Sequence, residues 1–214
     1  MARILRIDHS TPDLVTIREA VRVLDANGLV MYPTESSYAL GVNALRRIAV
    51  ERLYKAKGRP MSKSIPVIVS DLKMWKKYAH FNRTAEILVR KFNPGPLTLV
   101  LRKKPLVPNV LTSSSIAARI PGHRVALALV REANYPITST SANMSGEPPA
   151  YSLKSVPRSL RSKIDLILDA GTLERRKYST IVDVTIRGKP VVTRKGAIPT
   201  LAITRTLAQG RNEK

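Results

Sequence analysis

The segment Pro136–Gly146, PITSTSANMSG, begins with the pattern of a β-strand and ends with that of a turn. Hydroxyl and amide side chains occupy most of its positions. In α/β proteins, strand ends that run into such turns commonly bind ligands. On this segment alone two interpretations stay open. It is either a Ser/Thr-rich edge strand closed by an Asx-type turn, or a site for a polyanion or a polar small molecule.

Helices and strands alternate irregularly on both sides of this segment. Apolar residues at helical spacing predict helices between the N-cap Thr11 and the stop at Asn27-Gly28, and over residues 48–56, 72–78, 84–92, 123–134, 152–161 and 200–208. Short apolar runs predict strands over residues 29–32, 65–69, 97–101, 116–120, 164–168, 179–184 and 190–194, and another from Pro136. Residues 34–41 are expected to form a turn or short helix. This mixture predicts an α/β (or α+β) fold with a mixed sheet.

The length and composition favour one domain. The chain has 214 residues, from which we expect one domain over residues 1–208 and a flexible tail over 209–214. It contains no cysteine, which excludes disulfides, thiolate chemistry and cysteine–zinc sites. No apolar run is long enough for a membrane span, and no secretory signal is visible. We therefore expect a cytoplasmic protein without a membrane partner.

The charge of the chain is strongly positive. Lys and Arg number 37 against 15 Asp and Glu, for a formal net charge of +22. Such a field attracts phosphates, whether they belong to a nucleotide or to nucleic acid. The local basic runs at residues 102–104 and 175–177 are interpreted as solvated loops.

Common catalytic and nucleotide-binding motifs are absent from the sequence. It contains no HExxH, no carboxylate cluster suited to a metal, no Walker loop and no Rossmann glycine pattern. His9, His80 and His123 are expected to be surface or capping residues. A phosphate site in this chain must therefore be built from cations and hydroxyls.

A few cations and hydroxyls stand where such a site could form. Lys57 and Arg59 lie two residues apart at the end of a predicted helix, and Arg119 interrupts an apolar strand. A guanidinium in that setting needs an anion, either a ligand carboxylate or a carboxylate of the chain in a structural ion pair. Further candidates are Ser141, Asn143, Ser179 and Arg194.

Taken together, these residues resemble the YrdC/YciO family of threonylcarbamoyladenylate synthases and their relatives, roughly over residues 12–200. The matching motifs are YPTESSYALG (32–41), KGRP (57–60), NPGPLT (93–98), ARIP (118–121), SANMSG (141–146), YST (178–180) and TRKG (193–196). They are similar to the family's PTET-x-YGLG, KxR, WPGPLT, VRxP, SxN, EST and RxG elements, in the same order.

The resemblance implies a twisted mixed sheet with flanking helices and a concave basic pocket. The implied enzyme is a nucleotidyltransferase that forms threonylcarbamoyl-AMP and pyrophosphate from L-threonine, bicarbonate and ATP. Its product serves the t6A37 modification of tRNA through a downstream transferase machinery. Mg²⁺ would accompany ATP, and neither a protein-bound metal nor a prosthetic group is implied.

The resemblance also implies roles for individual residues. The catalytic set is Lys57, Arg59, Ser141 and Asn143. The ATP-binding set is Arg59, Lys63, Ser115, Ser141, Ser179 and Arg194. The threonine-binding set is Ser36, Arg119, Ser139 and Ser179.

Some positions depart from the family pattern. Ser36, Ala39, Lys63 and Pro149 stand where Thr, Gly, Asn and Ser are usual, and Ile68 replaces a histidine that helps to hold threonine. Two alternatives to the synthase therefore stay open. One is a YciO-like protein that binds double-stranded RNA, tRNA or the ribosome with weak or no synthase activity. The other is an enzyme that forms a carbamoyl-adenylate from a different amino acid.

Overall fold

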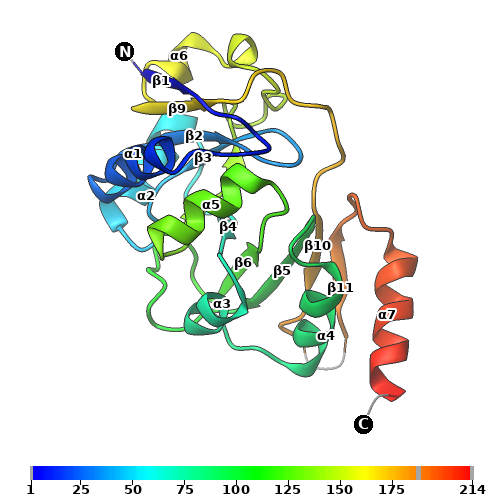
Figure 1. Cartoon of the computed structure of the whole chain (residues 1–214). Helices are drawn as coiled ribbons and strands as arrows, with labels where there is room; N and C mark the ends of the chain where they lie inside the picture. Colours follow the sequence, from blue (N-terminus) through cyan, green and yellow to red (C-terminus); the bar gives the residue numbers. More distant parts are fainter. Residues whose placement is uncertain (1, 187–188, 213–214) are drawn as a thin grey trace.

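The computed structural model describes residues 2–186 and 189–212, and within them the strands form two mixed sheets (Figure 1). The first sheet has the order β1-β9-β2-β3-β8, with β1 (Arg3–Arg6), β9 (Leu166–Asp169), β2 (Val30–Pro33), β3 (Tyr38–Gly41) and β8 (Thr140–Ser141). In it β9 is parallel to β1 and β2, whereas β3 is antiparallel to β2 and β8. The α/β class with mixed strand pairing is confirmed, but the strands are divided between two sheets.

The second sheet has the order β11-β10-β5-β6-β4-β7. Its strands are β11 (Val191–Arg194), β10 (Thr180–Asp183), β5 (Leu97–Arg102), β6 (Ser115–Arg119), β4 (Val67–Ile68) and β7 (Ile137–Thr138). The pairs β10/β5 and β4/β6 are parallel, and the other neighbours are antiparallel. Its last strand, β7, lies only two residues before β8 of the first sheet.

The segment Pro136–Gly146 therefore passes from one sheet to the other. Thr138 fixes the crossing: its Oγ1 accepts a hydrogen bond from the Val42 amide at 2.9 Å, and its carbonyl accepts one from the Tyr32 hydroxyl at 2.9 Å. At the next residue the Ser139 amide donates to the Pro66 carbonyl at 2.7 Å. These bonds are buried, so the junction of the two sheets is a fixed part of the core.

Four of the helices pack against one another in two pairs. Figure 1 shows α1 beside α5, and α7 alongside α4 at the opposite end of the molecule. Their bounds are α1 (Leu14–Asp25), α2 (Arg47–Lys57), α3 (Leu72–Tyr78), α4 (Arg83–Phe92), α5 (Arg124–Ala133), α6 (Arg158–Arg161) and α7 (Thr200–Asn212), with a 3₁₀ turn η1 (Leu153–Ser155). In α1 the residues Ile17, Ala20 and Leu24 are buried at helical spacing. Among the described residues, none of the helices is long and apolar enough to cross a bilayer.

Several sequence-based boundaries need correction. The N-cap of α1 is Asp13, whose carboxylate accepts from the Thr16 amide at 2.8 Å, and not Thr11. Residues 38–41 form β3 rather than a turn or helix, because Thr34 and Ser37 close a tight connection after β2. Strand β1 was not predicted, and the helix expected over 152–161 is split into η1 and α6.

The predicted C-terminal boundary is also too early. Helix α7 continues to Asn212, so residues 209–212 of the expected flexible tail are helical. Residues 213–214 lie outside the described part of the chain.

Candidate active site

A cavity of about 190 Å³ opens where the two sheets meet, and we call it the seam cavity. Its lining combines strand ends of both sheets with the loops beside them. The lining residues are Thr34, Ser36, Ser37, Ala39, Arg59, Pro66, Thr98, Arg119, Ser139, Thr140, Ser141, Tyr178, Ser179, Ile181 and Arg194. Most of the predicted site residues converge here: Ser36, Arg59, Arg119, Ser139, Ser141, Ser179 and Arg194.

Lys57 lies behind the wall of this cavity. It is the last residue of α2 and is only 2% exposed. Its Nζ donates to the carbonyls of Ser141 and Asn143 at 2.6 and 2.7 Å. Burial, and then the charge of Arg59, lower the Lys57 pKa to about 8. Lys57 therefore anchors the turn that carries Ser141 and adds positive charge beneath it.

Asn143 is engaged in the same turn and does not line the cavity. Its Nδ2 donates to the carbonyls of Met144 and Glu147 at 2.9 and 2.5 Å, and its Oδ1 accepts a hydrogen bond from the Ser141 hydroxyl. In this arrangement Ser141 faces the cavity and Asn143 orients it.

Arg59 follows the left-handed cap Gly58, whose φ of 60° ends α2 and turns the chain toward the cavity. The Arg59 Nε and Nη2 donate to the carbonyls of Lys63 and Ser64, both at 2.9 Å. These two bonds hold the guanidinium at the cavity without neutralising its charge. Lys63 contributes its backbone here, while its side chain is exposed and lies outside the cavity lining.

Ser115 also lies outside the cavity lining. It begins β6, whereas Arg119 ends that strand. Their Cα atoms are four steps apart along the strand, a distance of about 13 Å. The two ends of β6 therefore point to different parts of the molecule.

Arg119 lines the seam cavity and also forms an ion pair within the chain. Its Nε donates to Glu35 Oε1 at 3.1 Å, and the two side chains are only 8% and 16% exposed. Both open interpretations of Arg119 thus have a basis: it has a structural partner, and it presents charge to the cavity. Glu35 belongs to the YPTESSYALG motif and is not among the predicted site residues.

Ser179 and Arg194 form a second fixed cluster. The Arg194 Nε and Nη2 donate to the Ser179 carbonyl at 3.1 and 2.9 Å, and Nη2 donates to the Ser179 hydroxyl at 2.9 Å. The guanidinium also lies over the Tyr178 ring, 5.6 Å from its centroid. Burial lowers the Arg194 pKa, with a smaller contribution from the nearby Arg119 charge.

A glycine makes this cluster possible. A Cβ at Gly196 would lie 2.3 Å from the Tyr178 carbonyl oxygen, so only glycine lets the chain after β11 pass so close to Ser179. This accounts for the spacing of Arg194 and Gly196 in the TRKG motif.

The residues that depart from the family pattern differ in their position relative to the seam cavity. Ala39 lines the seam cavity. Ile68 is fully buried between β6 and β7, where its backbone is paired with Arg119 and Ile137, and it does not line the cavity. Pro149 lines a separate hollow beside Tyr151.

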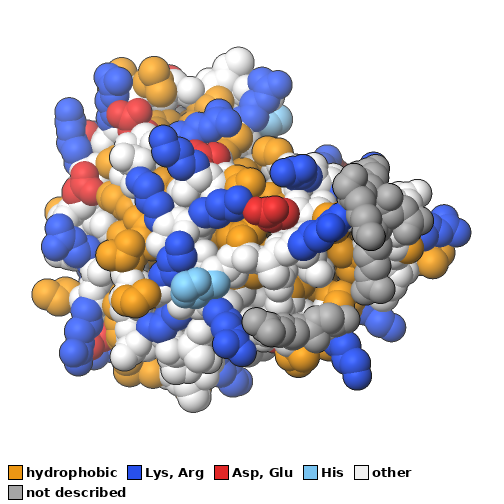
Figure 2. Space-filling view, turned by 90° about the horizontal axis from the view of Figure 1, so that it is seen from below, with side chains coloured by type: hydrophobic (Ala, Val, Ile, Leu, Met, Phe, Trp, Pro, Cys, Tyr) orange, Lys and Arg blue, Asp and Glu red, His pale blue; other side chains and the backbone are white. Residues whose placement is uncertain are grey.

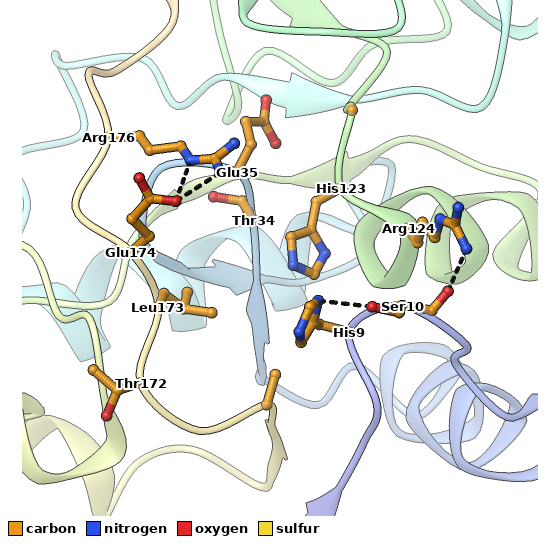
Figure 3. Close-up of a pocket in the computed structure, with 12 residues that line it drawn as sticks. His9, Ser10, Thr34, Glu35, His123, Arg124, Thr172, Leu173, Glu174 and Arg176 are labelled. Atoms are coloured by element: carbon orange, nitrogen blue, oxygen red, sulfur yellow. Dashed lines mark hydrogen bonds and ion pairs between the residues drawn. The ribbon is translucent and has the colours of Figure 1, made fainter.

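A larger cavity of about 550 Å³ adjoins the first through Thr34, and Figure 3 shows its lining. The rings of His9 and His123 lie next to one another in this view, and Arg176 pairs with Glu174 at 2.6 Å. His123 caps α5 by accepting from the Val125 amide at 3.3 Å, as expected for a capping histidine. Burial lowers the His123 pKa.

Three positively charged side chains meet at the seam cavity. Lys and Arg side chains are scattered over the face in Figure 2, with few acidic side chains among them. Within the seam cavity Arg59, Arg119 and Arg194 line a volume that fits a small polyanion. In the described ranges, no group of three or more His, Cys, Asp or Glu could hold a metal ion.

The motif order of the sequence is matched by a family model. The model for Sua5, YciO and YrdC proteins, described as telomere recombination, matches residues 22–196. The chain belongs to the Sua5/YciO/YrdC family. The predicted resemblance is therefore confirmed.

Individual relatives support this membership. The chain is 37% identical over 198 residues to a threonylcarbamoyl-AMP synthase of Pyrococcus abyssi, covering 91% of this chain and 58% of that protein. The structure of P. abyssi Sua5 complexed with L-threonine matches with a TM-score of 0.89 and 35% identity, over 95% of this chain and 60% of that one. Escherichia coli YciO matches with a TM-score of 0.86 and 28% identity, over 95% and 100%. The chain thus spans about three fifths of the synthase it matches.

Proposed function

We propose that the protein is an L-threonylcarbamoyladenylate synthase, a nucleotidyltransferase that uses L-threonine, bicarbonate and Mg–ATP. The observation that carries the proposal is the convergence of Arg59, Arg119 and Arg194 on one small cavity lined by hydroxyls. The relatives support the same choice, since identity is 37% to a protein named as the synthase and 28% to YciO. The YciO-like alternative is less favoured, because YciO matches over its whole length with a TM-score of 0.86 but with the lower identity.

In this proposal the threonine carboxylate binds Arg119. Its Nε is occupied by Glu35, which fixes the plane of the guanidinium and leaves the Nη edge for a ligand. A carboxylate can then accept two parallel hydrogen bonds. Ser36 and Ser139, which line the same cavity, supply hydroxyls for the polar groups of the amino acid.

The phosphates are assigned to the other side of the cavity. Arg59 and Arg194 lie at its walls with Ser141 and Ser179. When a carbamate oxygen attacks the α-phosphorus, negative charge grows on the phosphoryl oxygens and on the departing pyrophosphate. Fixed guanidinium groups stabilise that charge without having to reorganise.

The cavity volume supports an assignment for the rest of the nucleotide. Pockets that enclose drug-sized ligands measure about 300–1,000 Å³, and the seam cavity has about 190 Å³. It therefore suits an amino acid and the reacting phosphates, with the adenosine lying outside. We assign Mg²⁺ to the triphosphate as part of the substrate, because no carboxylate is among the residues that line the cavity.

Incubation with ATP, Mg²⁺, bicarbonate and labelled L-threonine tests the proposal. We expect threonylcarbamoyl-AMP and pyrophosphate in equal amounts, and neither when threonine or bicarbonate is omitted. The absence of threonine-dependent pyrophosphate from the complete mixture would contradict the proposal. A parallel series of amino acids tests whether the enzyme uses another substrate.

Use of the product in tRNA modification belongs to the same proposal. The net charge of +22 would favour an encounter with tRNA. A t6A transferase machinery would then be the downstream partner in the cytoplasm. Transfer of the labelled threonylcarbamoyl group to tRNA in a reconstituted mixture tests this part separately.

A further inference from the structure

Glu35 carries a polar atom that the chain leaves unsatisfied. It lies in the connection between β2 and β3, where its Oε1 accepts from Arg119 Nε at 3.1 Å. Its Oε2 is buried and has no hydrogen-bond partner among the described residues. A buried carboxylate oxygen without a donor is costly, so a ligand that brings a donor to this position gains binding energy.

The surroundings of Glu35 restrict the ligand. Glu35 itself lines the larger cavity and contacts the seam cavity through Arg119, and Thr34 beside it lines both cavities. In Figure 3 its carboxylate lies away from the rings of His9 and His123. The neighbouring Arg119 presents positive charge to the seam cavity. A ligand that matches both groups has an anion for Arg119 and, within a few bonds, a cationic donor for Glu35.

An α-amino acid has this arrangement, since one carbon joins its carboxylate to its ammonium group. We propose that Glu35 Oε2 accepts the α-ammonium group of the amino-acid substrate and takes one proton from it. This inference rests on the proposed synthase function and adds a chemical role to a residue that has so far been described only as the partner of Arg119.

The proton transfer is chemically necessary, because a protonated amine has no lone pair with which to attack. One proton passes from the ammonium to Glu35, giving a free amine. The amine nitrogen then forms a bond to the carbon of bicarbonate while the C–OH bond breaks. The hydroxide leaves as water with a second N–H proton, and the resulting carbamate attacks the α-phosphorus.

Other groups at the cavity are poor acceptors for this proton. Arg59, Arg119 and Arg194 have guanidinium groups, which offer hydrogen-bond donors and no acceptor. Lys57 donates to two carbonyls and faces the turn behind the wall. Among the residues that line the seam cavity, none has a carboxylate or an imidazole. Glu35 is the carboxylate in contact with that lining.

The first experiment separates recognition of the amino group from recognition of the carboxylate. Binding of L-threonine and of 3-hydroxybutanoate, which lacks the amino group, is measured by calorimetry on the wild type, Glu35→Gln and Glu174→Gln. We expect the wild type and Glu174→Gln to prefer threonine by ~10-fold or more. In Glu35→Gln the preference should fall toward equality. Equal binding of the two ligands by the wild type overturns the proposal without the need for a variant.

The second experiment isolates the proton transfer. Synthesis from threonine is compared with the reverse reaction, in which threonylcarbamoyl-AMP and pyrophosphate form ATP without any deprotonation of an amine. General-base contributions are ~10²–10⁴-fold, so we expect Glu35→Gln to lose at least ~10²-fold in synthesis and much less in the reverse direction. An equal loss in both directions means that Glu35 acts only by holding Arg119, and overturns the proposal.

The controls distinguish this inference from the proposed function. If the wild type makes no threonylcarbamoyl-AMP, the synthase proposal fails, while the comparison of the two ligands still tests amino-group recognition. If the wild type is active and Glu35→Gln matches it, only the present inference fails. Thermal unfolding of both variants shows that any loss arises in folded protein.

Discussion

The two adjoining cavities differ in the way that their charges are used. The larger one, of about 550 Å³, contains the exposed pair Glu174–Arg176 and two histidines. The smaller one, of about 190 Å³, contains three guanidinium groups held by backbone carbonyls or by Glu35. Carbonyl oxygens orient Arg59 and Arg194 without cancelling their charge, so the smaller cavity keeps its attraction for anions. We therefore base the proposed site on fixed charge and not on cavity size.

The strongest test of this difference removes Arg119. We expect Arg119→Ala to lower kcat/KM for threonine by ~10²–10³-fold, since a fixed charge at a reacting centre is worth about that much. It should also lower the unfolding temperature, because Glu35 is left buried without a partner. Steady-state pyrophosphate release and calorimetry measure the two effects. Retention of threonine binding by a folded variant would place the carboxylate elsewhere.

The next largest effect is expected at Ser141 and Asn143. Both substitutions should lower activity, and only that of Asn143 should also lower stability. Both Ser141→Ala and Asn143→Ala should reduce adenylate formation sharply, by about 10²-fold. Asn143→Ala should in addition lower the free energy of unfolding by about 1–3 kcal/mol, because its amide bonds the Met144 and Glu147 carbonyls. Urea unfolding of the two variants measures this difference in the free energy of unfolding. Full activity in both variants would show that this turn is not part of the site.

The pH dependence of stability tests the buried state of Lys57. The folded-state pKa is lowered from 10.5 to about 8, so between these values the unfolded chain binds more protons than the folded one. The Lys57 contribution to stability therefore rises with pH across this window, by up to about 3 kcal/mol at about 1.4 kcal/mol per pKa unit.

This rise is measured as the difference between the wild type and Lys57→Met in urea unfolding at pH 8 and above. Lys55→Met, at an exposed position of the same helix, serves as the control and should show no such slope. A flat difference for Lys57→Met would mean that its carbonyl partners keep the ammonium form as stable as it is in water.

The smallest effect is expected for a substitution in the larger cavity. Arg176→Ala breaks an ion pair whose side chains are 63% and 71% exposed, and such pairs contribute about 0–1 kcal/mol. We expect pyrophosphate release to change by less than ~2-fold. The unfolding free energy should differ from that of the wild type by no more than about 1 kcal/mol. A large loss of activity would show that the two cavities act as one.

The sequence is informative about the site because the motifs are local. The KGRP, SANMSG and TRKG segments each place a charged or hydroxyl side chain at the end of a helix or strand, and the structure brings Arg59, Ser141 and Arg194 to one cavity. Their mutual contacts depend on long-range packing. The hydrogen bonds from Lys57 to carbonyls of the SANMSG segment join residues 84 and 86 positions apart, and sequence periodicity has no information on such bonds.

Contacts between distant parts of the chain and local backbone geometry also explain the elements that were predicted incorrectly. Residues 34–41 are polar and then apolar, which fits a turn, yet β3 forms because its backbone pairs with β2 on one side and with β8 on the other. The partner β8 lies about a hundred residues later in the chain. Asp13 caps α1 in place of Thr11, since the two candidates are close in the sequence and only the backbone geometry selects between them.

The crossing of Pro136–Gly146 between the sheets has a consequence for its length. Side chains alternate between the faces of a strand, so the loss or gain of one residue turns every later side chain to the other face. Here such a change would disrupt both sheets. Thr138 would lose its hydrogen bonds with Tyr32 and Val42. Ser141 would lose its pairing with Ala39 and its place in the cavity lining. An insertion or deletion in this segment should therefore be more damaging than any single substitution in it.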